Sequence, residues 1–301
     1  MEAVTLTASD GYPLSLAVFA AEQPCGYIQI IHGMEEHKER YEPFAKWLCD
    51  AGYTVVTSDL RGHGTGAQTL GFFKEKDGDR YLLADQVQIA DYIQTRFHTE
   101  KIMLFAHSMG TIIARNLLCT QSHRYAKVVL CGYPNYPGAG SLRVGFFLTE
   151  LLGNVRGQTY HSKLVQQVAV GNFNKKIPHP KTEVDWICSN EQAVQAYIRD
   201  PYCGHGFCVS AFHDLFMLTA AMHEPSNYKD VAAELPILMI RGDEDPCTGY
   251  EEGAKDSVAV LKQAGFSKIT EITYPHMRHE LLNERGNETV YADVRAFYKK
   301  P

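Results

Sequence analysis

The chain alternates short apolar segments of strand length with longer segments of helical periodicity, and this alternation constrains its fold more than any other feature. The spacing predicts strands at 27–31, 53–57, 102–106, 127–131, 236–240 and 268–274, and helices at about 38–50, 81–98, 109–121, 210–222, 251–264 and 286–299. Such alternation is typical of an α/β protein with a mostly parallel sheet and helices on both faces. Residues 3–8 and 13–20 flank a turn sequence, so we expect an antiparallel hairpin at one edge.

The alternation is interrupted once, between Tyr133 and about Cys208, where no buried strand is predicted. This stretch contains Gly and Pro clusters, but its aromatic and aliphatic content is too high for a disordered segment. We therefore expect residues 1–135 and 209–301 to form the core, with an inserted helical cap over residues 136–208. Ligands of open α/β sheets bind beyond the carboxyl ends of the strands, where this insertion emerges. A helical subdomain remote from any site is the alternative.

Composition excludes several classes of protein. A chain of 301 residues with net charge −6 has no basic stripe for nucleic acid. No apolar stretch approaches the roughly 20 residues that span a bilayer, and the first residues do not resemble a signal peptide, so a cytoplasmic location is expected. The 8 cysteines form no C-x-x-C pair, which favours free thiols, with a Cys203–Cys208 disulfide as the alternative.

One serine, Ser108, lies between a predicted strand and a predicted helix, in the sequence AHSMG at 106–110. A serine in this position is often only a helix N-cap. It is also the position of the nucleophile in the strand-turn-helix elbow G-x-S-x-G, in which small residues on both sides keep a tight turn free of collisions. Ala106 replaces the first glycine, and a methyl group is tolerable there.

Partners for a nucleophilic serine follow later strands. The strand ending at Gly242 leads to Asp243 and Asp245, and the strand ending at Tyr274 leads to His276 and His279. A serine nucleophile needs a base, an acid that orients the base, and donors for the developing oxyanion. The order Ser, Asp, His along the chain is the order of the α/β-hydrolase fold.

Five segments of the chain resemble an α/β-hydrolase group that contains monoacylglycerol lipases, lysophospholipase-like esterases and hydrolases named after serine aminopeptidases. They are IIHGMEEHKERYEPFAKWL, SDLRGHGTG, AHSMG, RGDEDPC and MRHELLNE, in register from about residue 28 to 284. The resemblance implies an eight-stranded sheet with an inserted cap. It makes Ser108 the nucleophile, His279 the general base and Asp245 the orienting acid, with Asp243 and His276 as second choices.

The resemblance also assigns an oxyanion hole to the backbone N–H groups of Met34 and Met109. Gly33 and His107, beside these groups, are predicted to contact substrate. The apolar segment 145–153 of the cap suggests a cover for an acyl group, so substrate contacts are also predicted for Phe146, Phe147 and Leu151.

Other polar residues are interpreted as structural. His32 belongs to the oxyanion turn, and Arg61 and His63 are expected to brace loops beneath the site. His205, His213 and His223 have no second ligand at metal spacing, so no metal site and no cofactor are predicted. The glycine-rich segment GTGAQTLG lacks the lysine of a phosphate loop.

The predicted activity is hydrolysis of a carboxylic ester with an apolar acyl group through an acyl-enzyme. By resemblance, a monoacylglycerol or lysophospholipid is the first choice of substrate. An aminopeptidase or amidase is the alternative enzyme, because Glu150, Glu183 or Asp185 could anchor a free amine. A binding protein without turnover is the alternative from a different class. The oligomeric state is not predicted.

Overall fold

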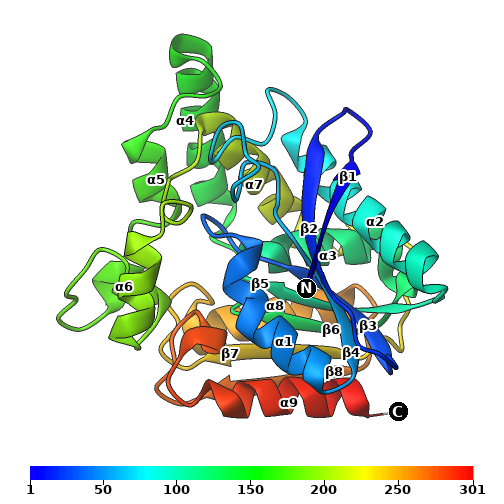
Figure 1. Ribbon diagram of the computed structural model, residues 1–301. Coiled ribbons are helices and arrows are strands. Elements are labelled where there is room, and N and C mark those ends of the chain that lie inside the picture. Colours follow the sequence, from blue (N-terminus) through cyan, green and yellow to red (C-terminus); the bar gives the residue numbers. More distant parts are fainter. Residues whose placement is uncertain (301) are drawn as a thin grey trace.

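The computed structural model describes residues 1–300, which fold around one eight-stranded sheet in the order β1-β2-β4-β3-β5-β6-β7-β8 (Figure 1). The strands are β1 (Glu2–Thr7), β2 (Pro13–Phe19), β3 (Gly26–Ile31), β4 (Tyr53–Ser58), β5 (Ile102–His107), β6 (Tyr125–Cys131), β7 (Ile237–Gly242) and β8 (Ile269–Tyr274). The β1–β2 and β2–β4 pairs are antiparallel, and the other pairs are parallel. This confirms the predicted mostly parallel sheet with a hairpin at its edge.

The central strands are buried along most of their length because helices cover both of their faces. Every residue of β4 is buried, as are the last four residues of β3 and of β5. On one face lie α1 (Glu42–Asp50) and α9 (Asn287–Lys299), and on the other lie α2 (Gly78–Phe97), α3 (Met109–Gln121) and α8 (Tyr250–Gln263). These helices begin and end within a few residues of the predicted positions.

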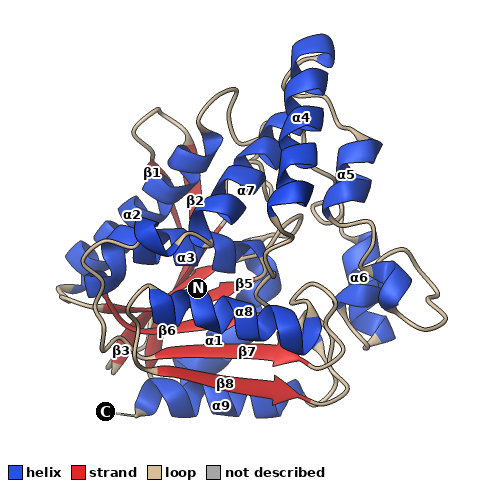
Figure 2. Cartoon of the chain, turned by 180° about the vertical axis from the view of Figure 1, so that it is seen from behind, coloured by secondary structure: helices blue, strands red, loops and turns tan. Residues whose placement is uncertain are grey.

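The insertion between β6 and β7 is helical. The segment expected as a cap, residues 136–208, contains α4 (Ala139–Arg156), α5 (Lys163–Ala169) and α6 (Glu191–Arg199), and α7 (Val209–Met222) follows it before β7. Helix α7 packs against α2 and α3, and α4 packs against α7 and α5. In Figure 2 the arrowheads of β7 and β8 point toward the side where α5 and α6 lie. The insertion therefore lies on the side of the sheet where its parallel strands end.

The structure also bears on the cysteines and on membrane-spanning segments. All 8 cysteines, which lie within the described residues, are free, so the alternative Cys203–Cys208 disulfide is not formed. None of the helices in residues 1–300 combines the length and the apolar character needed to cross a membrane.

Candidate active site

The turn between β5 and α3 holds Ser108 in a backbone conformation that is rare for a residue with a side chain, with φ 51° and ψ −122°. The Ser108 N–H donates to the carbonyl of Cys131 on β6 (3.0 Å), and its carbonyl accepts from the N–H of Thr111 (2.8 Å). Ser108 occupies the N-cap position of α3, but its side chain accepts no bond from the first turn, so the hydroxyl does not cap the helix. The surrounding hydrogen bonds hold a strained turn that lifts the hydroxyl away from the helix.

Glycine is required at the second small position of this turn. A Cβ on Gly110 would lie 2.4 Å from the carbonyl oxygen of Ile31 and 2.7 Å from that of His32, both on or next to β3. Ala106 is fully buried in β5, where its methyl group fits. The close approach of α3 to β3 therefore explains why this turn needs small residues.

Ser108, His279 and Asp245 form one continuous chain of hydrogen bonds. The Ser108 Oγ lies 2.8 Å from His279 Nε2, and His279 Nδ1 lies 2.9 Å from Asp245 Oδ2. Asp245 follows β7, His279 follows β8, and Ser108 follows β5, so the carboxyl ends of parallel strands bring together residues that are up to 171 positions apart. Asp245 is 0% exposed and His279 2%, while Ser108 keeps 9%.

The second choices for acid and base lie elsewhere. Asp243 Oδ1 accepts the backbone N–H of His276 (2.7 Å), and the His276 side chain is 89% exposed. The Asp243 carboxylate thus closes the turn after β8, a common role for aspartate. The structure brings Asp245 and His279, and not Asp243 and His276, to the serine.

The pKa values of the neighbouring histidines His279 and His107 are shifted in opposite directions. Burial disfavours the charged form of His279, but the charge of Asp245 and its hydrogen bond outweigh burial and raise the pKa of His279 above its ordinary value. Burial, with the nearby His279, lowers the pKa of His107 to about 4. The ring centroids of His107 and His279 are 4.9 Å apart. His107 is therefore a neutral neighbour, and of the two rings His279 is the one that binds a proton more readily.

The turn after β3 lies against the serine. A Cβ on Gly33 would come within 3.0 Å of the Ser108 Cβ, so only glycine fits. The Gly33 N–H donates to Glu36 Oε1 (2.6 Å), which fixes the turn. Within residues 1–300, the N–H groups of Met34 and Met109 donate to no backbone or side-chain acceptor. A role of these two N–H groups as an oxyanion hole stays a prediction.

An ion-pair network that the sequence analysis did not assign supports this turn. Arg40 donates to Glu36 Oε2 (2.7 Å) and, as a two-pronged fork, to both oxygens of Glu280 (2.7 Å each). Glu280 follows His279 directly in the chain. The guanidinium therefore joins the Gly33 turn to the His279 loop. The only signal in the sequence is the charged run at 35–40, which is indistinguishable from an exposed charged segment without the fold.

The predicted bracing residues have structural contacts. His32 Nε2 accepts the N–H of Leu60 (2.9 Å), and His63 Nε2 accepts the N–H of Glu35 (3.3 Å). Arg61 is paired with Asp85 and Asp10 at 2.5–3.0 Å and is 1% exposed. These contacts confirm that the three residues hold loops next to the site.

The apolar residues predicted to contact substrate lie on α4. Phe146 packs against the rings of His213 and Phe216, whereas Phe147 and Leu151 are 63% and 47% exposed. A role in substrate binding for these residues, and for Gly33 and His107, stays a prediction.

Part of the insertion is bonded to the loop that carries His279. The Glu280 N–H donates to the carbonyl of Ile187 (2.6 Å), and Arg278 Nη1 donates to the carbonyl of Asp185 (2.7 Å). The Trp186 ring between these two residues lies against the His279 ring, with centroids 4.9 Å apart. The insertion thus covers one side of the imidazole, which explains its small exposure.

A mostly parallel eight-stranded sheet, a serine on a strand-turn-helix elbow and a histidine and an aspartate after the last two strands define an α/β-hydrolase. The sequence profile of the family described as "Serine aminopeptidase, S33" matches residues 22–286. The chain belongs to this family.

Over nearly its whole length the chain is also similar to other proteins. The chain is 23% identical over 289 residues to phospholipase YtpA of Bacillus subtilis, covering 92% of this chain and 96% of that protein. A thermostable carboxyl esterase from Bacillus coagulans, solved with glycerol, has a TM-score of 0.88 at 23% identity and covers 98% of both chains. A soluble variant of the monoglyceride lipase from Saccharomyces cerevisiae has a TM-score of 0.76 at 17% identity, with 99% of this chain and 94% of that chain covered.

Proposed function

We propose that the protein is a serine hydrolase that cleaves carboxylic esters with an apolar acyl group, through an acyl-enzyme on Ser108. The observation that carries the proposal is the unbroken chain from Ser108 Oγ through the His279 ring to Asp245, with links of 2.8 and 2.9 Å. Membership of a hydrolase family and the names of similar proteins, a phospholipase, a carboxyl esterase and a monoglyceride lipase, support ester hydrolysis.

In the proposed reaction, His279 Nε2 removes the hydroxyl proton while Ser108 Oγ attacks the ester carbonyl. The ring becomes an imidazolium, which Asp245 stabilises through Nδ1. The carbonyl oxygen gains negative charge and binds to the N–H groups of Met34 and Met109. Collapse of the tetrahedral intermediate transfers the proton to the departing alcohol. A water molecule then attacks the acyl-enzyme by the same steps and releases the acid.

The surface of the insertion supports a lipid-like substrate. Val144, Phe147, Leu151 and Val155 recur at helical spacing on α4 and are 51%, 63%, 47% and 70% exposed. Exposed contiguous apolar surface is uncommon on soluble proteins and is often a site of interaction. We expect this face, within the proposed cap of residues 136–208, to favour esters with long acyl chains over acetate esters.

The positions of Glu150, Glu183 and Asp185 give little support to the alternative substrates, which carry a free amine. The Asp185 carboxylate accepts the N–H of Thr182 (3.2 Å) and also binds the hydroxyl of Thr182, so it closes a local turn. Glu150 is 65% exposed beside His213, and Glu183 is exposed. A buried carboxylate that faces Ser108 would favour a free amine; none of these three has that position.

The test compares the wild type with Ser108→Ala on p-nitrophenyl esters of graded acyl length and on aminoacyl amides. We expect loss of about 10⁶-fold in kcat and the loss of labelling by a fluorophosphonate probe. More than a few per cent of residual activity, or no labelling of the wild type, would overturn the proposal and favour a binding protein. Preference for aminoacyl amides would favour the aminopeptidase alternative. A cytoplasmic location remains part of the proposal and is checked by fractionation.

A further inference from the structure

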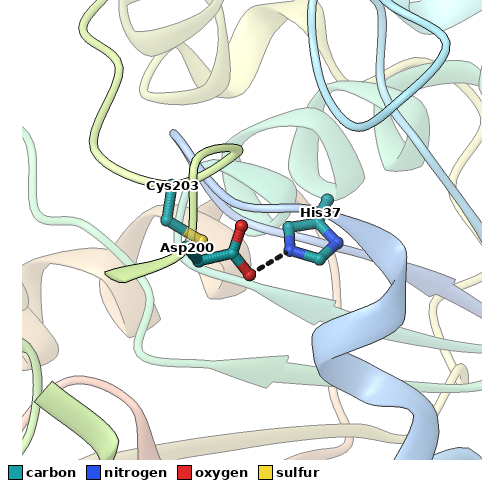
Figure 3. Close-up of side chains that lie close together, drawn as sticks. All are labelled: His37, Asp200 and Cys203. Carbon is teal, nitrogen blue, oxygen red and sulfur yellow. Dashed lines mark hydrogen bonds and ion pairs between the residues drawn. The ribbon is translucent and has the colours of Figure 1, made fainter. Parts of the chain in front are cut away.

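A second cluster of chemically active side chains joins the core to the insertion. His37, in the turn after β3, lies beside Asp200 and Cys203, in the loop after α6 (Figure 3). One ligand atom from each, the His37 ring nitrogen, an Asp200 oxygen and the Cys203 sulfur, lies within 4.8 Å of the other two. His37 and Asp200 are 163 positions apart, so sequence spacing does not predict the group.

We propose that His37, Asp200 and Cys203 form a binding site for a divalent transition metal ion, with Zn²⁺ as the ion that fits best. A thiolate, an imidazole and a carboxylate are the three ligand types that Zn²⁺ accepts, and hard cations such as Mg²⁺ do not favour sulfur. Three protein ligands leave a fourth tetrahedral position for water. The site is independent of the proposed esterase activity.

The surroundings of the ligands support the proposal because they orient each of them. The His37 Nδ1 lies 2.7 Å from Glu39 Oε2, which leaves Nε2 facing Asp200 Oδ2 at 2.8 Å. A carboxylate on the remote ring nitrogen is the usual second partner of a metal-bound histidine. Asp200 Oδ1 accepts the N–H of Tyr202 (2.9 Å), and this bond turns Oδ2 toward His37.

The ligands also have suitable burial and rigidity. His37 is 7% and Cys203 9% exposed, while the Asp200 side chain, at 29%, leaves an entry path. The Cys203 N–H donates to the Asp200 carbonyl (3.1 Å), which fixes the spacing of these two ligands in a tight turn. The next residue, Gly204, donates its N–H to the Glu35 carbonyl (3.1 Å), so the two ligand-bearing segments are already joined.

The exchange is balanced in charge. Without metal, both nitrogens of the His37 ring contact carboxylates, so the ring is an imidazolium, and Cys203 is a buried thiol. Binding of M²⁺ releases the Nε2 proton and the thiol proton, and the ion takes the place of two positive charges.

The experiment titrates the metal-free full chain with Co²⁺ and then displaces it with Zn²⁺, in the wild type, Cys203→Ser and the matched control Cys25→Ser, whose thiol is exposed. We expect one Co²⁺ per chain with a thiolate-to-cobalt charge-transfer band in the wild type and in the control. Cys203→Ser should lose the band. Absence of the band in the wild type, or its retention in Cys203→Ser, would overturn the proposal.

A second variant tests the ligand role of His37 without removing a ligand. Glu39→Gln should weaken Co²⁺ binding by about 10–100-fold, and unchanged affinity would contradict the assignment. Should Cys203→Ser fail to unfold cooperatively, X-ray absorption of the zinc-loaded wild type decides: one sulfur ligand at about 2.3 Å supports the site, and a shell of nitrogen and oxygen alone refutes it.

Discussion

Trp186 lies against the imidazole of His279, with ring centroids 4.9 Å apart and an angle of 41° between the planes. The first residue belongs to the insertion and the second to the loop after β8. A protonated imidazole quenches indole emission, so this contact makes Trp186 a reporter of the charge on His279.

The chain has 2 tryptophans, so Trp47→Phe isolates the emission of Trp186. We expect this emission to fall as pH is lowered, with a midpoint above 6.5, because Asp245 raises the pKa of His279 despite its burial. The control His279→Gln in the same background should show no such transition. A midpoint below 6.5 in the Trp47→Phe protein would contradict the electrostatic argument.

Asp245→Asn should reduce kcat by about 10⁴-fold, because the amide neither stabilises the imidazolium nor holds the required tautomer. The loss of the carboxylate charge should also lower the pKa of His279. Activity requires neutral His279, so the acid limb of the pH–rate profile should move to lower pH. The matched control is Asp243→Asn, two residues away, whose side chain bonds only the exposed turn at His276. An equal reduction of kcat in both variants would show that Asp245 is not the acid that orients His279.

Gly110→Ala should destabilise the fold by about 1–3 kcal/mol, as overpacking typically does. Its new methyl group would lie 2.4 Å from the carbonyl oxygen of Ile31, which is backbone and cannot rotate away. The shift of α3 should also lower kcat by moving the Met109 N–H. Gly140→Ala in α4 is the control, since nothing lies within 4 Å of its Cβ position. It should stabilise by roughly 0.5–1 kcal/mol. Urea unfolding measures both, and a stable, active Gly110→Ala protein would refute the elbow argument.

Arg40→Met should cost about 3–5 kcal/mol of stability, because it leaves the buried carboxylates of Glu36 and Glu280 without a partner. Burial opposes ionisation of Glu36, but the Arg40 charge holds the pKa of Glu36 to about 2. This depressed pKa means that the pairing contributes fully above pH 4.5 and is lost toward pH 2, so the two proteins should converge in acid.

The control for Arg40→Met is a solvent-exposed salt bridge on α1. Lys46 pairs with Glu42 at 2.6 Å on the exposed face of α1, and Lys46→Met should cost only about 0.3–0.5 kcal/mol. Thermal unfolding at several pH values compares the variants. A cost for Arg40→Met no larger than that for Lys46→Met would show that the network is not structurally important.

Much of this fold follows from local patterns that need no tertiary information. The apolar run of 102–106 and the helical spacing of 112, 113, 117 and 118 are set by which faces must be buried, and the strand and helix lie where these patterns predict them. The small residues around Ser108 and the order Ser, Asp, His along the chain are likewise properties of the sequence. The elbow and the parallel core were therefore predictable.

The remaining decisions depend on contacts between distant segments. Asp243 and Asp245 have the same side chain and both follow β7. They have different partners because the loop after β7 turns only Asp245 toward His279. The Arg40 fork to Glu280 joins residues 240 positions apart, and His37 meets Asp200 across 163. The hydrophobic periodicity of a short segment indicates which of its residues are buried. Only the closed fold decides which buried charges face one another, because that pairing is set by the geometry of loops at the ends of separate strands.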